Sequence, residues 1–170
     1  MSKILQPDYF SAPATVLAPA LLGKLLCRRR EDGSIVRVRI TETECYFGEQ
    51  DTACHASKGR TLRTDTLYLS GGVAYVYLCY GIHELFNVVT GPADHPEAVL
   101  IRGVEGAPGP GRATKLLGIT RAYNRLPLTP ETGLWIEDDG AVPEYEASER
   151  VGIGYATPED QARLWRYIIK

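Results

Sequence analysis

The sequence contains no apolar run long enough to cross a bilayer, so no membrane partner is expected. Its first residues, Met1 to Gln6, lack the charged start and apolar stretch of an export signal, and a cytoplasmic location is expected by default. The four cysteines include no C-x-x-C pair, so neither a zinc site nor a disulfide framework is indicated. We expect them to be small buried residues in a reducing compartment.

The chain also lacks an excess of positive charge, since 19 Lys and Arg residues stand against 21 Asp and Glu residues. This balance argues against a broadly basic nucleic-acid-binding protein. The basic residues are unevenly placed, however: acidic residues gather over 131–149, whereas the first half of the chain holds Arg28, Arg29, Arg30, Arg37, Arg39, Arg60 and Arg63. A narrow basic face on a near-neutral protein still allows contacts with phosphates.

No internal repeat, low-complexity tract or interdomain linker divides the 170 residues. The length and the hydrophobic fraction of 44% fit one globular domain, residues 1–170, with a single core. We expect a monomer by default.

The pattern of residues predicts mostly strands. Alternating or β-branched and aromatic runs favour strands over 35–46, 73–80, 85–89, 98–102 and 133–137. A helical stretch is expected over 14–26, capped by Ser11 and with Pro19 at an early position or a break, and a short helix is expected over 113–118. The glycines and prolines of 106–112 exclude regular structure there. These elements predict an α+β fold, a single domain with a largely antiparallel curved sheet and short peripheral helices.

The strand over 35–46 carries two carboxylates. Successive side chains of a strand point to opposite faces, so Glu42 and Glu44 are expected on the same inward face as Val36, Val38 and Ile40. Burying a bare carboxylate is unfavourable, so each glutamate is expected to be paired, protonated or functional. For either one taken singly, a salt bridge to an arginine explains the pattern as well as a functional role does.

Several polar and aromatic residues converge with that strand. A carboxylate stands beside a tyrosine, a histidine follows in a loop, two tyrosines share a strand face, and another lies near a hairpin tip: Glu44, Tyr46, His55, Tyr75, Tyr77 and Tyr80. A carboxylate can activate water and stabilise positive charge on a sugar during hydrolysis of an N-glycosidic bond. Aromatic walls can hold an extruded base, above all a positively charged alkylated purine.

Candidate phosphate contacts lie in two other segments. Arg60 and Arg63 fall in the polar stretch 56–72, which we expect on the surface. Arg112 and Lys115 flank the start of the helix predicted over 113–118, and a helix N-terminus favours anions. The glycines before this helix do not form the G-x-G-x-x-G pattern of a dinucleotide site.

A set of motifs extends over nearly the whole chain in a characteristic order: 43–48, Asp51 with His55, 74–81 with Asn87, 98–102, 109–111 with Lys115, and 150–154. No single motif is decisive, but the ordered set is highly specific. It resembles the alkyladenine (3-methyladenine) DNA glycosylases, the purine base excision enzymes of the type also found in vertebrates.

The resemblance implies a monofunctional DNA repair glycosylase that acts on double-stranded DNA without metal or cofactor. Such an enzyme flips out alkylated purines, with deaminated and etheno-bridged purines as further candidates. It hydrolyses the N-glycosidic bond with an activated water and leaves an abasic site.

The resemblance also implies roles for individual residues. Glu44 is the expected general base, and Arg102 and the backbone carbonyl of Val151 are the expected further ligands of its water. Tyr46, His55 and Tyr77 are expected to stack on and edge the flipped base, with Tyr75 supporting them. Tyr80 is expected to act as a wedge that fills the gap in the duplex, and Asn87 to exclude the amino group of normal guanine. His83 is expected to add a further contact to a base or a phosphate.

Two other interpretations stay open at the level of sequence. A non-catalytic reader of distorted DNA or modified RNA would use the tyrosines, but it has no need for the pair formed by Glu44 and Arg102. A sugar hydrolase would use Glu42 and Glu44 as paired carboxylates, which lie about 7 Å apart at the backbone. Both carboxylates would approach a sugar from the same side, which disfavours that mechanism.

Overall fold

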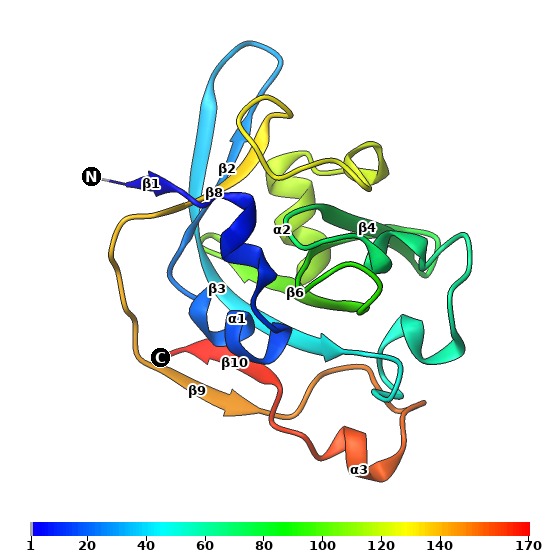
Figure 1. Ribbon diagram of the computed structural model, residues 1–170. Helices are drawn as coiled ribbons and strands as arrows, with labels where there is room; N and C mark the ends of the chain where they lie inside the picture. Colours follow the sequence, from blue (N-terminus) through cyan, green and yellow to red (C-terminus); the bar gives the residue numbers. More distant parts are fainter. Residues whose placement is uncertain (1) are drawn as a thin grey trace.

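The computed structural model describes residues 2–170, in which the strands pair antiparallel throughout (Figure 1). They are β1 (Lys3–Ile4), β2 (Leu25–Arg29), β3 (Ile35–Phe47), β4 (Ala74–Cys79), β5 (His83–Val89), β6 (Glu97–Val104), β7 (Ala107–Pro108), β8 (Leu134–Asp138), β9 (Tyr145–Ser148) and β10 (Arg166–Ile169). The main order is β1-β8-β2-β3-β6-β5-β4; β10 pairs with β3 and β9, and β7 with β6. The predicted α+β class with a largely antiparallel sheet is confirmed.

The helices are short and lie at the sides of the sheet (Figure 1). They are α1 (Ala14–Ala20), α2 (Pro110–Leu117) and α3 (Pro158–Gln161), and 3-10 turns lie at Pro7–Ser11, His55–Lys58, Asp65–Tyr68 and Arg121–Tyr123. Helix α1 packs on β3 and β6, and α2 packs on β5 and β6. Among the helices within residues 2–170, none has the length and apolar character needed to span a bilayer.

The helix predicted over 14–26 is wrong in its second half. Helix α1 ends at Ala20, Gly23 adopts a left-handed φ of +85°, and the following leucines enter β2. Pairing with both β3 and β8 gives this segment a place inside the sheet, which overrides its helical pattern.

The starts of the helices also differ from prediction. Ser11 does not cap α1, because Pro13 is the N-cap residue and the Ser11 hydroxyl donates to the Asp8 carbonyl at 2.6 Å. Helix α2 begins at Pro110, a residue whose fixed φ suits the first helical turn. Residues 106–112 therefore do include regular structure, since β7 and the first turn of α2 fall within them.

An irregularity in β3 changes which residues face the main core. Ile40 pairs with Val104, but the register against β6 shifts on both sides of Glu42, which leaves Thr41 and Arg102 as extra residues. One extra residue exchanges the two faces of a strand. Before this bulge Val36, Val38 and Ile40 pack on the main core, and after it Cys45 and Phe47 do so.

The bulge contradicts the prediction that both glutamates share a face with Val36, Val38 and Ile40. Glu42 and Glu44 do share a face with each other, as their common partner Arg102 shows, but it is the opposite face of the sheet. Tyr46 lies on this second face and packs against a separate buried cluster that includes Tyr75. The bulge thereby directs the carboxylates away from the main core.

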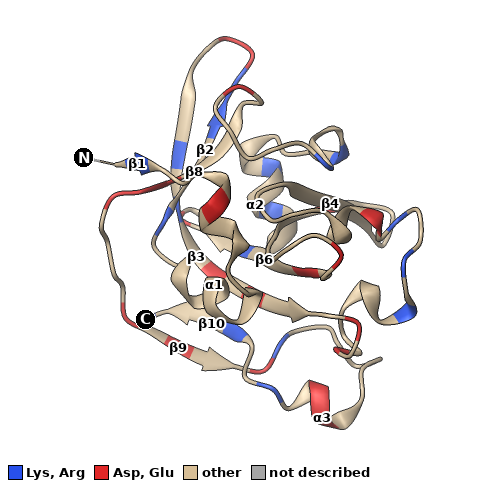
Figure 2. Ribbon diagram, in the orientation of Figure 1, with Lys and Arg blue, Asp and Glu red and all other residues tan. Residues whose placement is uncertain are grey.

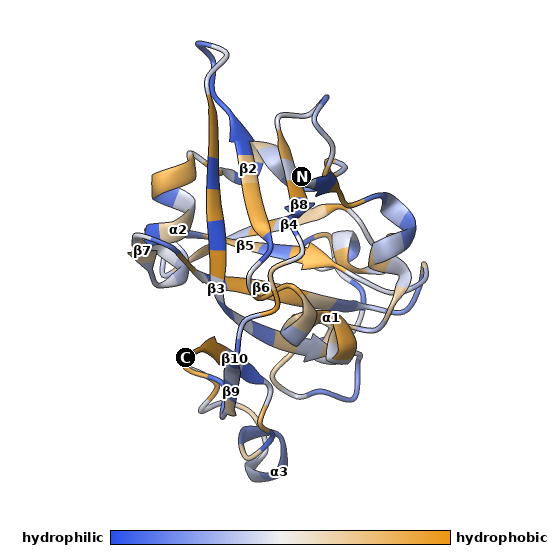
Figure 3. Cartoon of the chain, turned by 90° about the vertical axis from the view of Figure 1, so that its left-hand side faces the viewer, coloured by the Kyte–Doolittle hydropathy of each residue, from blue (hydrophilic) through white to orange (hydrophobic). Residues whose placement is uncertain are grey.

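The main core lies between the sheet and helices α1 and α2, and its largest fully buried side chains include Phe10, Phe86 and Leu26. Figure 3 shows apolar residues along β2 and α1, and a hydrophilic turn between β2 and β3. The smaller cluster on the other face includes Cys54, Leu67 and Tyr75. This second face carries the candidate site.

Candidate active site

Glu44 lies in β3 beyond the bulge, and none of its surface is exposed. Its Oε1 accepts a hydrogen bond from the Tyr46 hydroxyl at 2.7 Å, and its Oε2 accepts one from the Val151 backbone N–H at 2.8 Å. Each carboxylate oxygen has two lone pairs, so each keeps one with which it can accept from water. Tyr46, Arg102 and Val151 line the adjacent cleft and Glu44 does not. These three residues therefore separate the carboxylate from the cleft.

Burial shapes the acid–base properties of both hydrogen-bonded partners. It raises the pKa of Glu44, and the hydrogen bonds from Val151 and Tyr46 and the charge of Arg102 oppose this rise. Burial and the neighbouring Glu44 carboxylate together hold the pKa of Tyr46 well above its ordinary value. Tyr46 is therefore a permanent hydrogen-bond donor to Glu44 near neutral pH.

Arg102 interacts more closely with Glu42 than with Glu44. Its Nε lies 3.1 Å from the Glu42 carboxylate and 3.8 Å from Oε2 of Glu44. The Nε of Arg166 lies 2.6 Å from the same oxygen of Glu42. A paired-carboxylate mechanism needs Glu42 to face a sugar, whereas two arginines hold it here. The structure does not favour the sugar-hydrolase interpretation.

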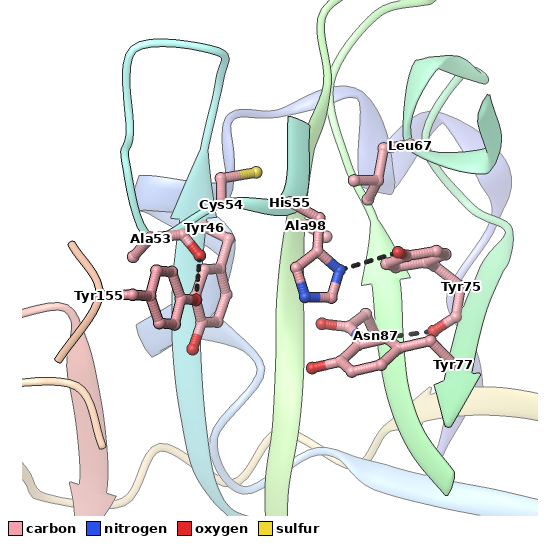
Figure 4. A pocket seen from close by; sticks show the side chains of 10 residues that line it. All are labelled: Tyr46, Ala53, Cys54, His55, Leu67, Tyr75, Tyr77, Asn87, Ala98 and Tyr155. Atoms are coloured by element: carbon pink, nitrogen blue, oxygen red, sulfur yellow. Dashed lines mark hydrogen bonds between the residues drawn. The ribbon is translucent and has the colours of Figure 1, made fainter. Parts of the chain in front are cut away.

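A narrow pocket with aromatic walls lies beside Tyr46 (Figure 4). Its lining comes from β3, the loop that follows, β4, β5, β6 and the segment before α3: Tyr46, Ala53, Cys54, His55, Leu67, Tyr75, Tyr77, Asn87, Ala98 and Tyr155. The His55 and Tyr77 ring centroids are 4.6 Å apart at 70°, and those of Tyr75 and Tyr77 are 5.4 Å apart. The structure thus brings together all five residues predicted to contact a base.

The pocket presents uncharged polar groups that can hydrogen-bond to the edge of a base. Burial, with a smaller contribution from Arg63, lowers the pKa of His55 to about 4, so the imidazole is neutral at pH 7. Its Nδ1 lies 2.9 Å from the Tyr75 hydroxyl. When that hydroxyl donates to Nδ1, Nε2 carries the proton and is a donor. Asn87 is buried, and its Nδ2 donates to the Tyr75 carbonyl at 3.3 Å, which fixes the orientation of the amide.

A larger cleft continues outward from the pocket and shares with it Tyr46, His55, Tyr77 and Tyr155. Four of the six residues predicted to contact DNA line this cleft: Arg63, Tyr80, His83 and Arg112. Arg60 and Lys115 do not. The Arg60 guanidinium instead lies 2.6 Å from Asp65 and 3.2 Å from Asp94.

The hairpin between β4 and β5 ends in an exposed tip, as predicted. Tyr80 and Gly81 both have left-handed φ angles, of 52° and 67°, and the Ile82 N–H donates to the Cys79 carbonyl at 3.1 Å. Tyr80 is 89% exposed and Ile82 75% exposed. Two large side chains are therefore exposed at the tip; Tyr80, which the sequence predicted, lines the cleft, and Ile82, which it did not, lies two residues further on.

The predicted basic face is divided. Figure 2 shows basic segments on β2 and β3 and others at α2 and in the loop before β4, with acidic segments between them. On β3, Arg37 pairs with Glu137 at 3.2 Å and Arg39 with Asp139 at 2.8 Å. The cations that face the cleft are those of Arg63, Arg102 and Arg112.

Two further buried residues support the site and were not assigned a role from sequence. The Arg150 guanidinium donates to both oxygens of Asp51 at 2.7 and 3.0 Å and to the Cys45 carbonyl at 2.9 Å. It lies 5.1 Å from the centre of the Tyr46 ring and precedes Val151 in the chain. Asp51 and Arg150 both occur in motifs noted in the sequence, but their pairing joins residues 99 positions apart.

Nearly the whole chain matches known proteins. The model of a family described as methylpurine-DNA glycosylase matches residues 8–107 and 105–170. A protein of Psychrobacter cryohalolentis is 43% identical over 99% of this chain and 92% of its own length. A protein of Myxococcus xanthus is 46% identical over 95% of this chain and 89% of its own length. A protein of Methanocella arvoryzae is 39% identical over 98% of this chain and 92% of its own length. All three carry the name "Putative 3-methyladenine DNA glycosylase".

Proposed function

The chain belongs to the methylpurine-DNA glycosylase family and is a DNA repair enzyme that hydrolyses N-glycosyl bonds, and we propose that its substrates are alkylated purines in double-stranded DNA. Deaminated and etheno-bridged purines are further candidate substrates. The purine is flipped into the aromatic pocket and released with an activated water, which leaves an uncut abasic site.

The observation that carries this proposal is the position of Glu44. Its buried carboxylate accepts hydrogen bonds from Tyr46, which lines both the pocket and the cleft, and from Val151, which lines the cleft. In the proposed mechanism Glu44 accepts a proton from water as the water oxygen attacks the sugar carbon. The bond from that carbon to the purine nitrogen breaks, and its electron pair leaves with the base. Arg102 and the Val151 carbonyl orient the water.

The remaining lining supports recognition of a flipped purine. Tyr46, His55 and Tyr77 stack on and edge the base, supported by Tyr75, and Asn87 excludes the 2-amino group of normal guanine. A cationic alkylated purine gains from the tyrosine faces by cation–π attraction.

Residues that line the cleft contact the rest of the duplex. Tyr80 fills the gap left by the flipped nucleotide, as its exposed place at the hairpin tip allows. Arg63, His83 and Arg112 contact phosphates along the cleft. A reader that only binds DNA would use the same surface but would not need the buried carboxylate.

We also propose that the enzyme works as a monomer in the cytoplasm. Every residue in the proposed mechanism comes from one chain. Cys27, Cys45 and Cys54 are free and buried, which fits a reducing compartment.

The direct test is a set of duplexes that each carry one lesion, incubated with excess enzyme. We expect release of an alkylated purine with first-order kinetics, and strand breakage only after alkali treatment. Strand cleavage without alkali would exclude the monofunctional mechanism. A complete absence of base release from every lesion would favour the non-catalytic reader.

The rate of excision should fall with decreasing pH at a higher pH than an ordinary glutamate predicts. Glu44 acts as base only when ionised, and its raised pKa moves loss of the charge above the ordinary value of about 4.3. His55, with a pKa of about 4, stays neutral over most of this range and does not produce the decrease. Single-turnover rates measured across the acidic and neutral range check this. An acid limb at or below the ordinary glutamate value would contradict the assignment.

A further inference from the structure

Tyr155 occupies a position that the roles assigned above do not use. It lies between β9 and α3, and its side chain borders the base pocket, the large cleft and a third groove beside the Thr61–Thr64 turn. The residue is 66% exposed, yet its hydroxyl reaches inward and donates to the Ala53 carbonyl at 2.7 Å. Figure 4 shows its ring beside Tyr46 at one end of the pocket.

The backbone around Tyr155 is held more firmly than its ring. Ile153 and Ala156 are buried in a small cluster with Ala53, and the Val151 N–H is bonded to Glu44. The described contacts of the Tyr155 side chain include one hydrogen bond, that to Ala53. The ring can therefore turn at the rim while its backbone keeps the geometry of the site.

The acceptor of this hydrogen bond, the Ala53 carbonyl, lies in the wall of the base pocket. Ala53 is 1% exposed, and a carbonyl is an acceptor only. In Figure 4 the carbonyl lies across His55 from Asn87. A purine that places its 2-position at Asn87 would carry its 6-substituent toward Ala53 and Tyr155. That substituent is an amino donor in alkylated adenines and an oxo acceptor in hypoxanthine, which lacks the 2-amino group of guanine.

We propose that Tyr155 is a specificity-determining residue, whose hydroxyl allows the pocket to accept both 6-amino and 6-oxo purines. The proposal rests on the function proposed above. A phenol hydroxyl both donates and accepts. When it donates to Ala53, its oxygen accepts from a 6-amino group, and when it turns toward the base, it donates to a 6-oxo group. Without the hydroxyl, a 6-oxo purine loses this donor, and its oxygen and the Ala53 carbonyl would face each other as two acceptors.

The test is Tyr155→Phe, which keeps the ring and removes the hydroxyl. Single-turnover release of 3-methyladenine is compared with release of hypoxanthine, a 6-oxo purine without a 2-amino group, both from duplex DNA. We expect release of hypoxanthine to fall about tenfold relative to 3-methyladenine, because an unpaired buried acceptor is unfavourable. Tyr145→Phe is the matched control, since Tyr145 lies on β9, packs on Tyr167 and lines none of the three cavities, so all rates should stay unchanged.

The outcomes separate this inference from the proposed function. A wild-type enzyme that releases no base from any lesion contradicts the proposed function itself. A wild-type enzyme that releases only 6-amino purines, or a Tyr155→Phe variant whose rates change by the same factor for every lesion, overturns the role of Tyr155 alone. The thermal midpoint of the variant is measured alongside, and a change in the ratio of rates at an unchanged midpoint supports the proposal.

Discussion

Replacing Glu44 with glutamine is expected to reduce base excision by about 10²–10⁴-fold, the usual contribution of a general base. Glutamine keeps the shape of the side chain and the local hydrogen bonds. Its oxygen can accept from the Val151 N–H, and its amide can donate to the Tyr46 hydroxyl, which both donates and accepts. Binding to a duplex with an abasic-site analogue should therefore persist while single-turnover excision is lost.

Thermal unfolding of the Glu44→Gln variant distinguishes a loss of catalysis from misfolding. The pKa of Glu44 is raised in the folded state, so ionisation of the carboxyl disfavours folding above that pKa. The neutral glutamine variant should unfold at the wild-type temperature or above it at pH 7. Glu105→Gln is a suitable control, because Glu105 is exposed and lines neither the pocket nor the cleft. Excision by Glu44→Gln at the normal rate would remove Glu44 from the mechanism.

Local pattern was enough to predict the strands that carry the site. The alternation in β4 places Tyr75 and Tyr77 on one face, and the glycine after Tyr80 marks the hairpin tip, both as observed. These features depend on residues close in sequence, where strand period and turn chemistry decide the structure.

The features that the local sequence pattern did not predict depend on pairing between segments far apart in the chain. The two faces of β3 exchange because Thr41 in β3 and Arg102 in β6 have no partner where these two strands pair. Neither residue type predicts such a bulge from its own sequence neighbourhood. The segment Leu25–Arg29 reads as a helix until β3 and β8 are present on either side. The role proposed for Tyr155 depends on the hydrogen bond from its hydroxyl to the Ala53 carbonyl, 102 positions away in the chain.

Breaking the ion pair between Asp51 and Arg150 is expected to have the largest effect on stability. Both side chains are almost completely buried, and Asp51 also accepts from the backbone N–H groups of Phe47 and Ala53. Asp51→Asn keeps an acceptor but leaves the Arg150 charge uncompensated in the interior. Removing one partner of a buried pair typically lowers the free energy of unfolding by about 3–5 kcal/mol. Urea unfolding measures this loss.

The same change should also impair excision, because the pair holds the residues around Glu44. Arg150 precedes Val151, donates to the Cys45 carbonyl between Glu44 and Tyr46, and packs on the Tyr46 ring. The exposed pair of Arg39 and Asp139 gives the matched control, and Asp139→Asn should alter stability by at most about 1 kcal/mol. The double variant Asp51→Asn with Arg150→Met removes the stranded charge and should recover part of the stability, but not the excision rate, since the Arg150 hydrogen bonds are gone. Recovery of both together would show that the pair stabilises the fold without positioning the site.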